Sequence, residues 1–533
     1  MTDISGCRDA ARVRRGESDI MNDVGGGRIA ERAGAQGIAS AAVHNFSSAE
    51  AATAVRARAE PAPLTHRERR IIVMAMMMPV FMGSIDQSIL ASALPTIGRV
   101  FGDLHDLPWV ITSYLIASTA LTPLYGKFAD IHGRRASLMV ALGIYMMGSL
   151  ISAASTSLLM LIVGRIVQGC GGGGLVTISQ MVLGDIAPPK DRAKYYAYFS
   201  VAFTSAGAVG PALGGWICQH LHWSLIFLWK FPFCLIAAAL SWNMLRRLPR
   251  FDRPHRLDVI GAVLVMASST SFMLALNLGG ARYPWLSAPV LGLLASAFLL
   301  GAAFVVRLLS AVEPLIPIAV LADPTARIAT LIHCFGWGSL IGLNIFLPMY
   351  LQSELGWSPT DAGLSLIILM GTLNTSAGLT SQLIGRVKHY KALPILFLCV
   401  AIGAVLALAY WASNMTPLKF EIILLLIGIG FGPTAPLTQV VLQNTVAMNH
   451  LGTAIGTMSF CRTLVGTIIV AVFGAIVLAG TPGGTGTLAA TGTSISAFAT
   501  VFLGVAGALV IALVALILLE EKPLQATMPA SSR

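Results

Sequence analysis

The chain has 533 residues, of which 56% are hydrophobic and only 11% are charged, and its mean hydropathy is +0.77. Most of it reads as consecutive apolar segments of spanning length, which no soluble domain of this size needs. The net charge of +11 could suggest a nucleic-acid partner, but the first seventy residues hold eleven Arg and nine acids, a balance of only +2. Because most of the excess positive charge lies in the connections between the apolar segments, we expect no nucleic-acid binding.

Residues 1–65 differ in composition from the rest and are rich in Ala, Arg, Gly and Ser. They lack apolar periodicity and contain no continuous apolar run of the kind found in a cleaved signal peptide. We therefore predict a disordered tail. A second flexible segment is predicted at Thr481–Thr493, which reads TPGGTGTLAATGT.

Fourteen apolar runs follow the tail, and each predicts a membrane-spanning helix. Continuous runs favour helices over the alternating ten-residue strands of a membrane barrel. We thus expect an all-α polytopic membrane protein. The predicted helices cover residues 71–97, 109–126, 137–154, 158–183, 196–217, 223–245, 257–278, 287–309, 327–353, 361–384, 393–412, 419–444, 452–479 and 496–519.

The connections between these helices differ strongly in basic residues. If the N-terminus is cytoplasmic, the inward connections and the C-terminal tail hold seventeen Lys and Arg residues, whereas the outward connections hold only Arg99, Arg282 and Lys419. Basic residues favour the cytoplasmic side of a membrane. The sequence therefore predicts that both termini are cytoplasmic and that the protein lies in the inner (plasma) membrane.

Asp86 is an acidic residue in the middle of the first apolar run, IIVMAMMMPVFMGSIDQSILASALPTI. It lies about 22 Å along a helix that starts at Ile71, which is near the middle of the membrane. An ionisable group at this depth is costly and indicates a functional site. The alternative is a carboxylate that only hydrogen-bonds to a neighbouring helix.

Several kinds of chemistry are not expected. The seven cysteines are scattered and include no CxxC pair, so we predict neither a disulfide framework nor a metal site. No Ser-His-Asp set, HExxH motif or Walker lysine is present, so we expect no enzyme. The run Gly171–Gly174 lacks GK[ST] and lies in an apolar helix, which favours close helix packing over phosphate binding.

Residues 126–135, between the second and third predicted helices, read GKFADIHGRR. Gly126 permits close approach of two helices, and Gly133 permits a tight turn. Asp130 can cap a helix or pair with a cation. Arg134 and Arg135 anchor the connection on the inner side.

Two further patterns lie inside helices. The fourth predicted helix contains LIVGRIVQG, residues 161–169, in which Arg165 lies about ten ångströms from the outer end. Arg165 could be functional, or it could only tie helix ends together through carbonyl groups. The fifth contains GPALGG, where Pro211 removes a backbone donor and three glycines predict a flexible, close-packed seam: Gly210, Gly214 and Gly215.

With these motifs in order, the chain resembles the major facilitator superfamily, and within it the fourteen-helix drug:proton antiporters. Residues 85–95, IDQSILASALP, are similar to the first-helix motif LDxTIVNVALP of these antiporters, and the patterns of the two preceding paragraphs resemble their loop, fourth-helix and fifth-helix motifs. Residues 223–232, WSLIFLWKFP, are similar to WRWIFxINxP, and residues 347–352, LPMYLQ, to LPLYLQ. The resemblance covers about residues 66–520.

The resemblance implies a major facilitator fold with two six-helix bundles and two inserted helices around a midplane cavity that alternates its access. The expected divisions are a tail at 1–65, a bundle at 66–250, the inserted pair at 251–312, a bundle at 313–520 and a tail at 521–533. It also implies that Asp86 binds protons and helps with cationic substrates, that Arg165 assists proton transfer, and that Asp130 to Arg135 belong to a conformational latch. We expect Asp130 to lie near the cytoplasmic start of the thirteenth predicted helix, around Leu451 to Thr453, where a carboxylate meets the positive end of a helix dipole. No cofactor other than a proton gradient is implied.

Lys230 is the main departure from the antiporter pattern, because asparagine is usual at this position. Its ammonium could extend to the outer interface, which we favour, or face the cavity and select anionic or neutral substrates. Other polar residues are cavity candidates, although each could make only interhelical hydrogen bonds. They are Gln168, Gln180, Asn344, Asn374, Gln439, Gln443 and Arg462.

The sequence thus predicts an exporter of small lipophilic compounds whose partners are its substrate, protons and the lipid bilayer, with any accessory export protein left open. The alternative within transport is a symporter or uniporter for a nutrient or siderophore, which only the direction of flux separates from an exporter. A different class is a membrane sensor or scaffold that transports nothing. Such a protein would need a folded output domain, which the low-complexity tail does not suggest.

Overall fold

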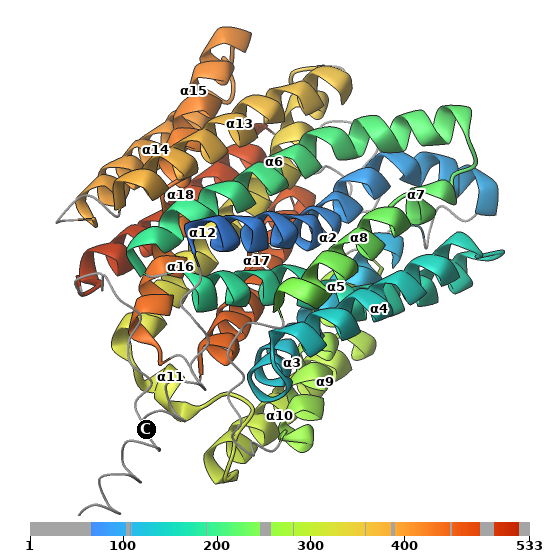
Figure 1. The fold of residues 1–533 in the computed structure, drawn as a ribbon. Helices are drawn as coiled ribbons and strands as arrows, with labels where there is room; N and C mark the ends of the chain where they lie inside the picture. Colours follow the sequence, from blue (N-terminus) through green and yellow to red (C-terminus); the bar gives the residue numbers. More distant parts are fainter. Residues whose placement is uncertain are drawn as a thin grey trace, which may run out of the picture. The chain divides into compact units, whose positions relative to one another are not determined.

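The computed structural model describes residues 65–102, 107, 109–187, 189–245, 257–280, 282–357, 359–384, 390–447, 450–479 and 495–521. The predicted disordered tail, apart from Thr65, and the predicted flexible segment at 481–493 lie outside these residues. The regular elements described are all α-helices, apart from a single bridge between Gly279 and Tyr283. They run in the order α2 (His66–Phe101), α3 (Trp109–His132), α4 (Arg134–Ala153), α5 (Leu158–Ile186), α6 (Pro189–His220), α7 (Leu225–Leu228), α8 (Phe231–Met244), α9 (Val259–Leu278), α10 (Ala288–Ser310), α11 (Ile318–Ala322), α12 (Pro324–Ser353), α13 (Pro359–Ile384), α14 (Ala392–Tyr410), α15 (Pro417–Phe431), α16 (Thr434–Thr445), α17 (Leu451–Ala479) and α18 (Ile495–Leu518) (Figure 1).

Within the described residues, thirteen helical segments are long and apolar enough to cross a membrane. They correspond to thirteen of the fourteen predicted spans. The second predicted span forms as helix α3 but is not among the thirteen, since it carries polar residues that it buries against its neighbours, including Ser113, Thr119 and Thr122. The multi-pass, all-α membrane architecture is confirmed.

Several helices extend beyond their predicted bounds because hydropathy detects only the part that lies in lipid. Helices α3 and α4 are separated by Gly133 alone, so most of the predicted loop motif is helical. Gly133 has a φ of 83°, the left-handed region that its turn requires. Two predicted helices are instead interrupted, one between α7 and α8 and the other between α15 and α16.

The helices pack in neighbouring groups. Helix α5 lies between α3 and α4, and α2 lies along α6 (Figure 1). Later in the chain, α14 packs on α15 and α18, and α12 packs on α17 and α18. The hairpin of α9 and α10 contacts α3 and α17 through α9. The predicted residue bounds of two bundles and an inserted pair stay a prediction.

The glycine run of α5 is explained by close helix packing. A Cβ atom on Gly171 would lie 2.3 Å from the backbone nitrogen of Tyr145 in α4, and one on Gly173 would lie 2.4 Å from the carbonyl oxygen of Ser118 in α3. No real Cβ atom fits at such distances. The packing interpretation is therefore confirmed, and the run lets α5 approach two helices at once.

The glycines of α6 divide between two environments. A Cβ atom on Gly210 would lie 2.0 Å from Ser88 Oγ, and one on Gly214 would lie 2.4 Å from Ser92 Oγ. These two glycines, one turn apart, form the seam with α2. Gly215 meets nothing within 4 Å and is not part of the seam. Pro211 lies in α6 between the two seam positions.

Candidate functional site

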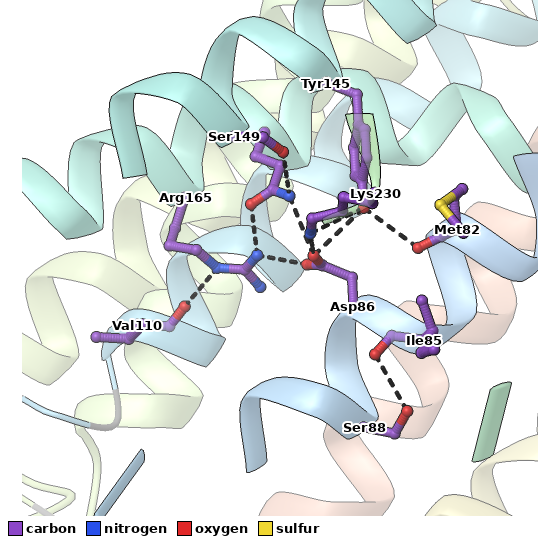
Figure 2. Close-up of polar contacts among 10 residues, drawn as sticks. Met82, Ile85, Asp86, Ser88, Val110, Tyr145, Ser149, Arg165 and Lys230 are labelled. Atoms are coloured by element: carbon purple, nitrogen blue, oxygen red, sulfur yellow. Dashed lines mark hydrogen bonds and ion pairs between the residues drawn. The ribbon is translucent and has the colours of Figure 1, made fainter. Parts of the chain in front are cut away.

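Asp86 lies twenty residues into α2 and is 1% exposed. Its carboxylate forms ion pairs with the Arg165 guanidinium of α5 and with the Lys230 ammonium at the start of α8 (Figure 2). The two predicted coupling residues are therefore in direct contact. Their roles in proton transfer stay a prediction.

Arg165 connects this cluster to a third helix. Its Nε donates to the carbonyl oxygen of Val110 in α3 at 3.0 Å, and its Nη1 donates to Gln168 Oε1 at 2.6 Å. Its guanidinium carbon lies 4.3 Å from the ring centroid of Tyr114. The guanidinium thus binds a carbonyl group and also pairs with Asp86, and a functional role for Arg165 stays a prediction.

Gln168 and Tyr145 also make polar contacts with the Asp86 carboxylate. Gln168 Nε2 donates to Asp86 Oδ1 at 3.0 Å and to Ser149 Oγ at 2.9 Å. Tyr145 Oη lies 3.3 Å from Asp86 Oδ1 and accepts from Lys230 Nζ at 3.2 Å. Sequence reasoning did not identify Tyr145 or Ser149, although their spacing of four residues places both on one face of α4.

The preferred interpretation of Lys230 as a residue that extends to the outer interface is wrong, since its side chain is 1% exposed and pairs with Asp86. The reason is the break in the sixth predicted helix. Helix α7 ends at Leu228, and α8 begins at Phe231 with Pro232 in its first turn. Lys230 lies at the N-cap position between them and points toward α2 (Figure 2).

The cluster of Asp86, Arg165 and Lys230 holds one negative group and two positive groups. Each is nearly or completely buried, so water cannot compensate the charge. Buried charges are tolerated when they are paired and hydrogen-bonded. The Nη2 atom of Arg165 has no partner within the described residues. With Lys230 protonated, the network therefore carries one more positive than negative charge.

A second polar network joins the end of α3 to the beginning of α17. Asp130 accepts from the backbone N–H groups of Gly452 at 3.2 Å and Thr453 at 2.8 Å, and from Thr453 Oγ1 at 2.7 Å. A carboxylate is favourable at the positive end of a helix. The predicted position of Asp130, beside Leu451 to Thr453, is confirmed.

Arg134 joins Asp130 to α5. Its Nη1 lies 2.7 Å from Asp130 Oδ1, and its Nε lies 2.7 Å from Asp185 Oδ2. We call the set of Asp130, Arg134, Asp185, Gly452 and Thr453 the latch. Sequence reasoning did not identify Asp185. A Cβ atom on Gly452 would lie 2.4 Å from Asp130 Oδ1, so the contact needs glycine there.

The other motif residues lie around the latch. A Cβ atom on Gly126 would lie 2.8 Å from the carbonyl oxygen of Gly452, so Gly126 lets α3 approach α17. The Arg135 guanidinium carbon lies 3.5 Å from the ring centroid of Trp242 in α8, a cation–π contact outside the latch. Of the predicted motif, Asp130 and Arg134 thus belong to the latch, Gly126 allows the helices to approach, and Arg135 contacts α8.

A further contact joins α6 to α16 through Arg192, which sequence reasoning did not identify. Its Nη1 donates to the carbonyl oxygen of Gln443 at 2.7 Å and its Nη2 to that of Gly184 at 2.8 Å. Burial lowers the pKa of Arg192 to about 10, so it stays charged near neutral pH. Gln443 Nε2 also donates to Tyr196 Oη at 2.6 Å. Gln443 is therefore an interhelical contact in this conformation.

The remaining cavity candidates are dispersed. Asn344 and Asn374 each donate to a carbonyl oxygen of their own helix, at 2.8 and 2.7 Å. Gln439 Oε1 lies 3.3 Å from Tyr196 Oη. The Arg462 guanidinium carbon lies 4.9 Å from the ring centroid of Trp337. Among the described residues, no three His, Cys, Asp or Glu side chains gather closely enough to hold a metal ion.

Comparison with known proteins places the chain in a transporter family. The model of the Major Facilitator Superfamily matches residues 76–471. Multidrug transporter protein MdtP of Bacillus subtilis (strain 168) is 28% identical over 77% of this chain and 75% of its own length. Multidrug resistance protein 3 of the same organism is 28% identical over 76% of this chain and 79% of its own length. Efflux pump dotC of Dothistroma septosporum (strain NZE10 / CBS 128990) is 29% identical over 74% of this chain and 69% of its own length.

Solved structures of other transporters are similar to this chain in their fold. The human organic anion transporter MFSD10 superposes with a TM-score of 0.61 at 16% identity, covering 83% of this chain and 99% of that one. The proton:xylose symporter XylE gives a TM-score of 0.56 at 15% identity, and the match covers 83% of this chain and 95% of that one. The family match, the spans and the fold lead to one conclusion: the chain belongs to the major facilitator superfamily and is a membrane transporter related to drug efflux proteins.

Proposed function

We propose that the chain exports small lipophilic compounds across the plasma membrane in exchange for protons. The observation that carries this proposal is the buried cluster of Asp86, Arg165 and Lys230, because ionisable groups inside a membrane are costly and are typical of proton and substrate pathways. The names of the relatives, multidrug transporter and efflux pump, support export.

The direction of access follows from the basic residues of the connections. Their asymmetry supports cytoplasmic termini, and it therefore supports a latch on the cytoplasmic side. The latch and the Arg192 contact then close that side in this conformation. To open it, the N–H groups at the start of α17 must separate from Asp130. The contact between Asp130 and α17 is then either made or broken, and alternating access requires two such discrete states.

The charges of the cluster suggest which group exchanges the proton. Protonation of Asp86 would leave two buried cations without a counterion, whereas loss of a proton from Lys230 would leave one balanced pair of Asp86 and Arg165. We therefore place the exchanged proton on Lys230, and we give Asp86 the role of the counterion that binds protonated Lys230. In this scheme Lys230 Nζ takes up a proton from water when the cluster is open to the outside, and it releases the proton to water when the cluster is open to the cytoplasm.

The cycle couples access to this protonation. When Lys230 is protonated, its ion pair with Asp86 holds the start of α8 against α2. When the proton leaves, that attraction is lost, and Asp86 is paired with Arg165 alone. Movement of α8 relative to α2 thus depends on proton binding to Lys230. A conformational switch needs such an interaction, one that differs in free energy between its two states.

The test is transport by the purified protein in proteoliposomes with an imposed pH gradient. A fluorescent compound is placed on the side of the latch, and its movement is followed with the gradient in the inward or outward proton direction. We expect movement of the compound against the proton flow, together with measurable proton movement in the opposite direction. Movement that is unaffected by the gradient would contradict proton coupling.

The same experiment separates the alternatives. Movement of the compound in the same direction as protons would indicate a symporter, and gradient-independent equilibration would indicate a uniporter. No movement of any tested compound by folded protein would favour a sensor or scaffold. The GPALGG seam between α6 and α2 is the feature that favours exchange over symport, because the resemblance associates this motif with antiporters.

A further inference from the structure

A second polar cluster lies on α12, α16 and α17, helices other than those that carry Asp86, Arg165 and Lys230. Arg462 and His333 both contact Trp337: the guanidinium carbon of Arg462 lies 4.9 Å from the ring centroid, and the His333 ring stacks at 6.4 Å between centroids. His333 Nδ1 lies 2.8 Å from Thr438 Oγ1. We call these four residues the Arg462 cluster.

The Arg462 cluster lies near the middle of the membrane. Arg462 is eleven residues after Leu451, about 16 Å along α17, and His333 is nine residues after Pro324, about 14 Å along α12. The first turns of these two helices share an apolar cluster that includes Ala326 and Leu451, so both depths are measured from one end of the molecule. Arg462 and Trp337 are partly exposed, whereas His333 is only 4% exposed.

The cluster has hydrogen-bonding groups without partners. Within the described residues, Arg462 Nε and His333 Nε2 are buried and have no partner, and no acidic side chain forms an ion pair with Arg462. The Thr438 hydroxyl lies 2.9 Å from the carbonyl oxygen of Thr434, its acceptor one turn back. Thr438 Oγ1 therefore accepts from His333 Nδ1–H, and in the neutral form of the ring Nε2 is then an acceptor.

These groups define the chemistry of a missing partner. An unpaired guanidinium within the membrane is costly and is best satisfied by a carboxylate, sulfonate or phosphate oxygen. While Lys230 is protonated, the Asp86 cluster also carries an uncompensated positive charge, so a cationic compound would then meet excess positive charge at both clusters. An anionic compound would reduce that excess. A hydroxyl or amine on the same compound could donate to His333 Nε2.

We propose that the transported compound is an organic anion, whose acidic group binds Arg462 and whose donor group binds His333. This inference deepens the proposed transport function and rests on it. It departs from a preference for lipophilic cations, because the described residues of the two clusters include a single carboxylate, Asp86, which two cations already pair. Arg462 and His333 thus set the charge of the substrate, while Lys230 carries the proton.

The first measurement is binding, which needs no proton gradient. Purified full-length protein in lipid nanodiscs is titrated with fluorescein, a xanthene anion, and with rhodamine 6G, a xanthene cation. Fluorescence polarisation gives both dissociation constants. We expect fluorescein to bind at least tenfold more tightly than rhodamine 6G. A preference for rhodamine 6G would overturn the proposal.

The second measurement assigns the preference to Arg462. Arg462→Gln should weaken fluorescein binding by about tenfold to a hundredfold, which is the usual effect of losing a charged hydrogen bond. Arg462→Lys keeps the charge and should retain most of the binding. Lys419→Gln is the matched control, since Lys419 also lies near a tryptophan ring, 5.5 Å from the centroid of Trp411, but is exposed near the start of α15. Equal fluorescein binding by Arg462→Gln and the wild type would refute the assignment.

The same preparations distinguish failure of this inference from failure of the proposed function. Fluorescein binding that depends on Arg462, with no gradient-driven movement in proteoliposomes, would support the anion site and contradict proton-coupled export. Gradient-driven movement of rhodamine 6G, with fluorescein neither bound nor moved, would support export and contradict the anion site. If Arg462→Gln does not fold, the dye preference of the wild type and the binding by Arg462→Lys decide the outcome.

Discussion

Lys230 and Asp86 form a buried ion pair between the start of α8 and the middle of α2, and Arg165 binds the same carboxylate from α5. One carboxylate therefore pairs with two cationic side chains that come from different helices. Removal of any member changes both the charge balance and the attraction between helices. This relationship leads to two predictions about coupling, and the latch and the glycine seam lead to two more.

Asp86→Asn should abolish gradient-driven transport. The substitution keeps the side-chain volume but leaves Arg165 and Lys230 as two buried cations without a counterion. Breaking a buried pair in this way costs about 3–5 kcal/mol, so thermal stability should fall as well. Transport in proteoliposomes and thermal unfolding of purified protein give the two readouts. Asp361→Asn, at an exposed acid of α13, should change neither, and undiminished transport by Asp86→Asn would remove Asp86 from the coupling role.

Lys230→Met should leave a folded protein whose transport no longer depends on the pH gradient. The remaining pair of Asp86 and Arg165 is balanced, and the group to which we assign the proton is gone. The ratio of cationic to anionic dye movement should rise, because one positive charge is removed from the pathway. Dye and proton movement are measured together in proteoliposomes, with Lys419→Met as the control. Proton coupling equal to that of the wild type would show that Lys230 does not carry the proton.

Asp130→Asn should destabilise the conformation that is closed at the latch. The charge that faces the N-terminus of α17 is lost, which is worth about 1–2 kcal/mol in a buried geometry, or about five- to thirtyfold in the population of the closed state. Labelling of Ala454→Cys with an impermeant maleimide, in a chain without other cysteines, reports opening because Ala454 is buried in α17 near the latch.

The matched control for the latch is Asp323→Asn. Asp323 also caps a helix, accepting from the backbone N–H of Ala326 at 2.9 Å, but this contact lies at the start of α12 and does not join α3 to α17. We expect labelling to accelerate in Asp130→Asn and to stay at the wild-type rate in Asp323→Asn. Equal rates in all three proteins would show that the Asp130 contact does not hold that side closed.

Gly210→Ala should lower the free energy of unfolding by about 1–3 kcal/mol, the usual cost of an added methyl group in a close-packed interface. The new Cβ atom would overlap Ser88 of α2, whereas the same change at Gly215 meets nothing within 4 Å. Thermal unfolding of the two variants in one detergent isolates the seam from the general effect of Gly→Ala in a helix. Identical melting temperatures for the two variants would mean that the seam does not limit stability.

The sequence by itself determined the membrane architecture, because transfer of long apolar runs into lipid dominates the free energy and is read directly from composition. Thirteen of the fourteen predicted spans were found, and the remaining one, α3, has its hydropathy lowered by polar residues that only packing explains. The sequence also located Asp86, Arg165 and Asp130, since a charge inside an apolar run or at a helix end is visible without any structure.

Only the tertiary structure decided what these groups contact. The position of Lys230 depended on the break between α7 and α8, which directs its ammonium to Asp86 instead of the interface where hydropathy would place it. Tyr145, Asp185 and Arg192 look unremarkable as single residues and acquire partners through helices far away in the chain. Hydropathy acts on each segment separately, whereas ion pairs and hydrogen bonds act between segments, and their geometry exists only after the helices have packed.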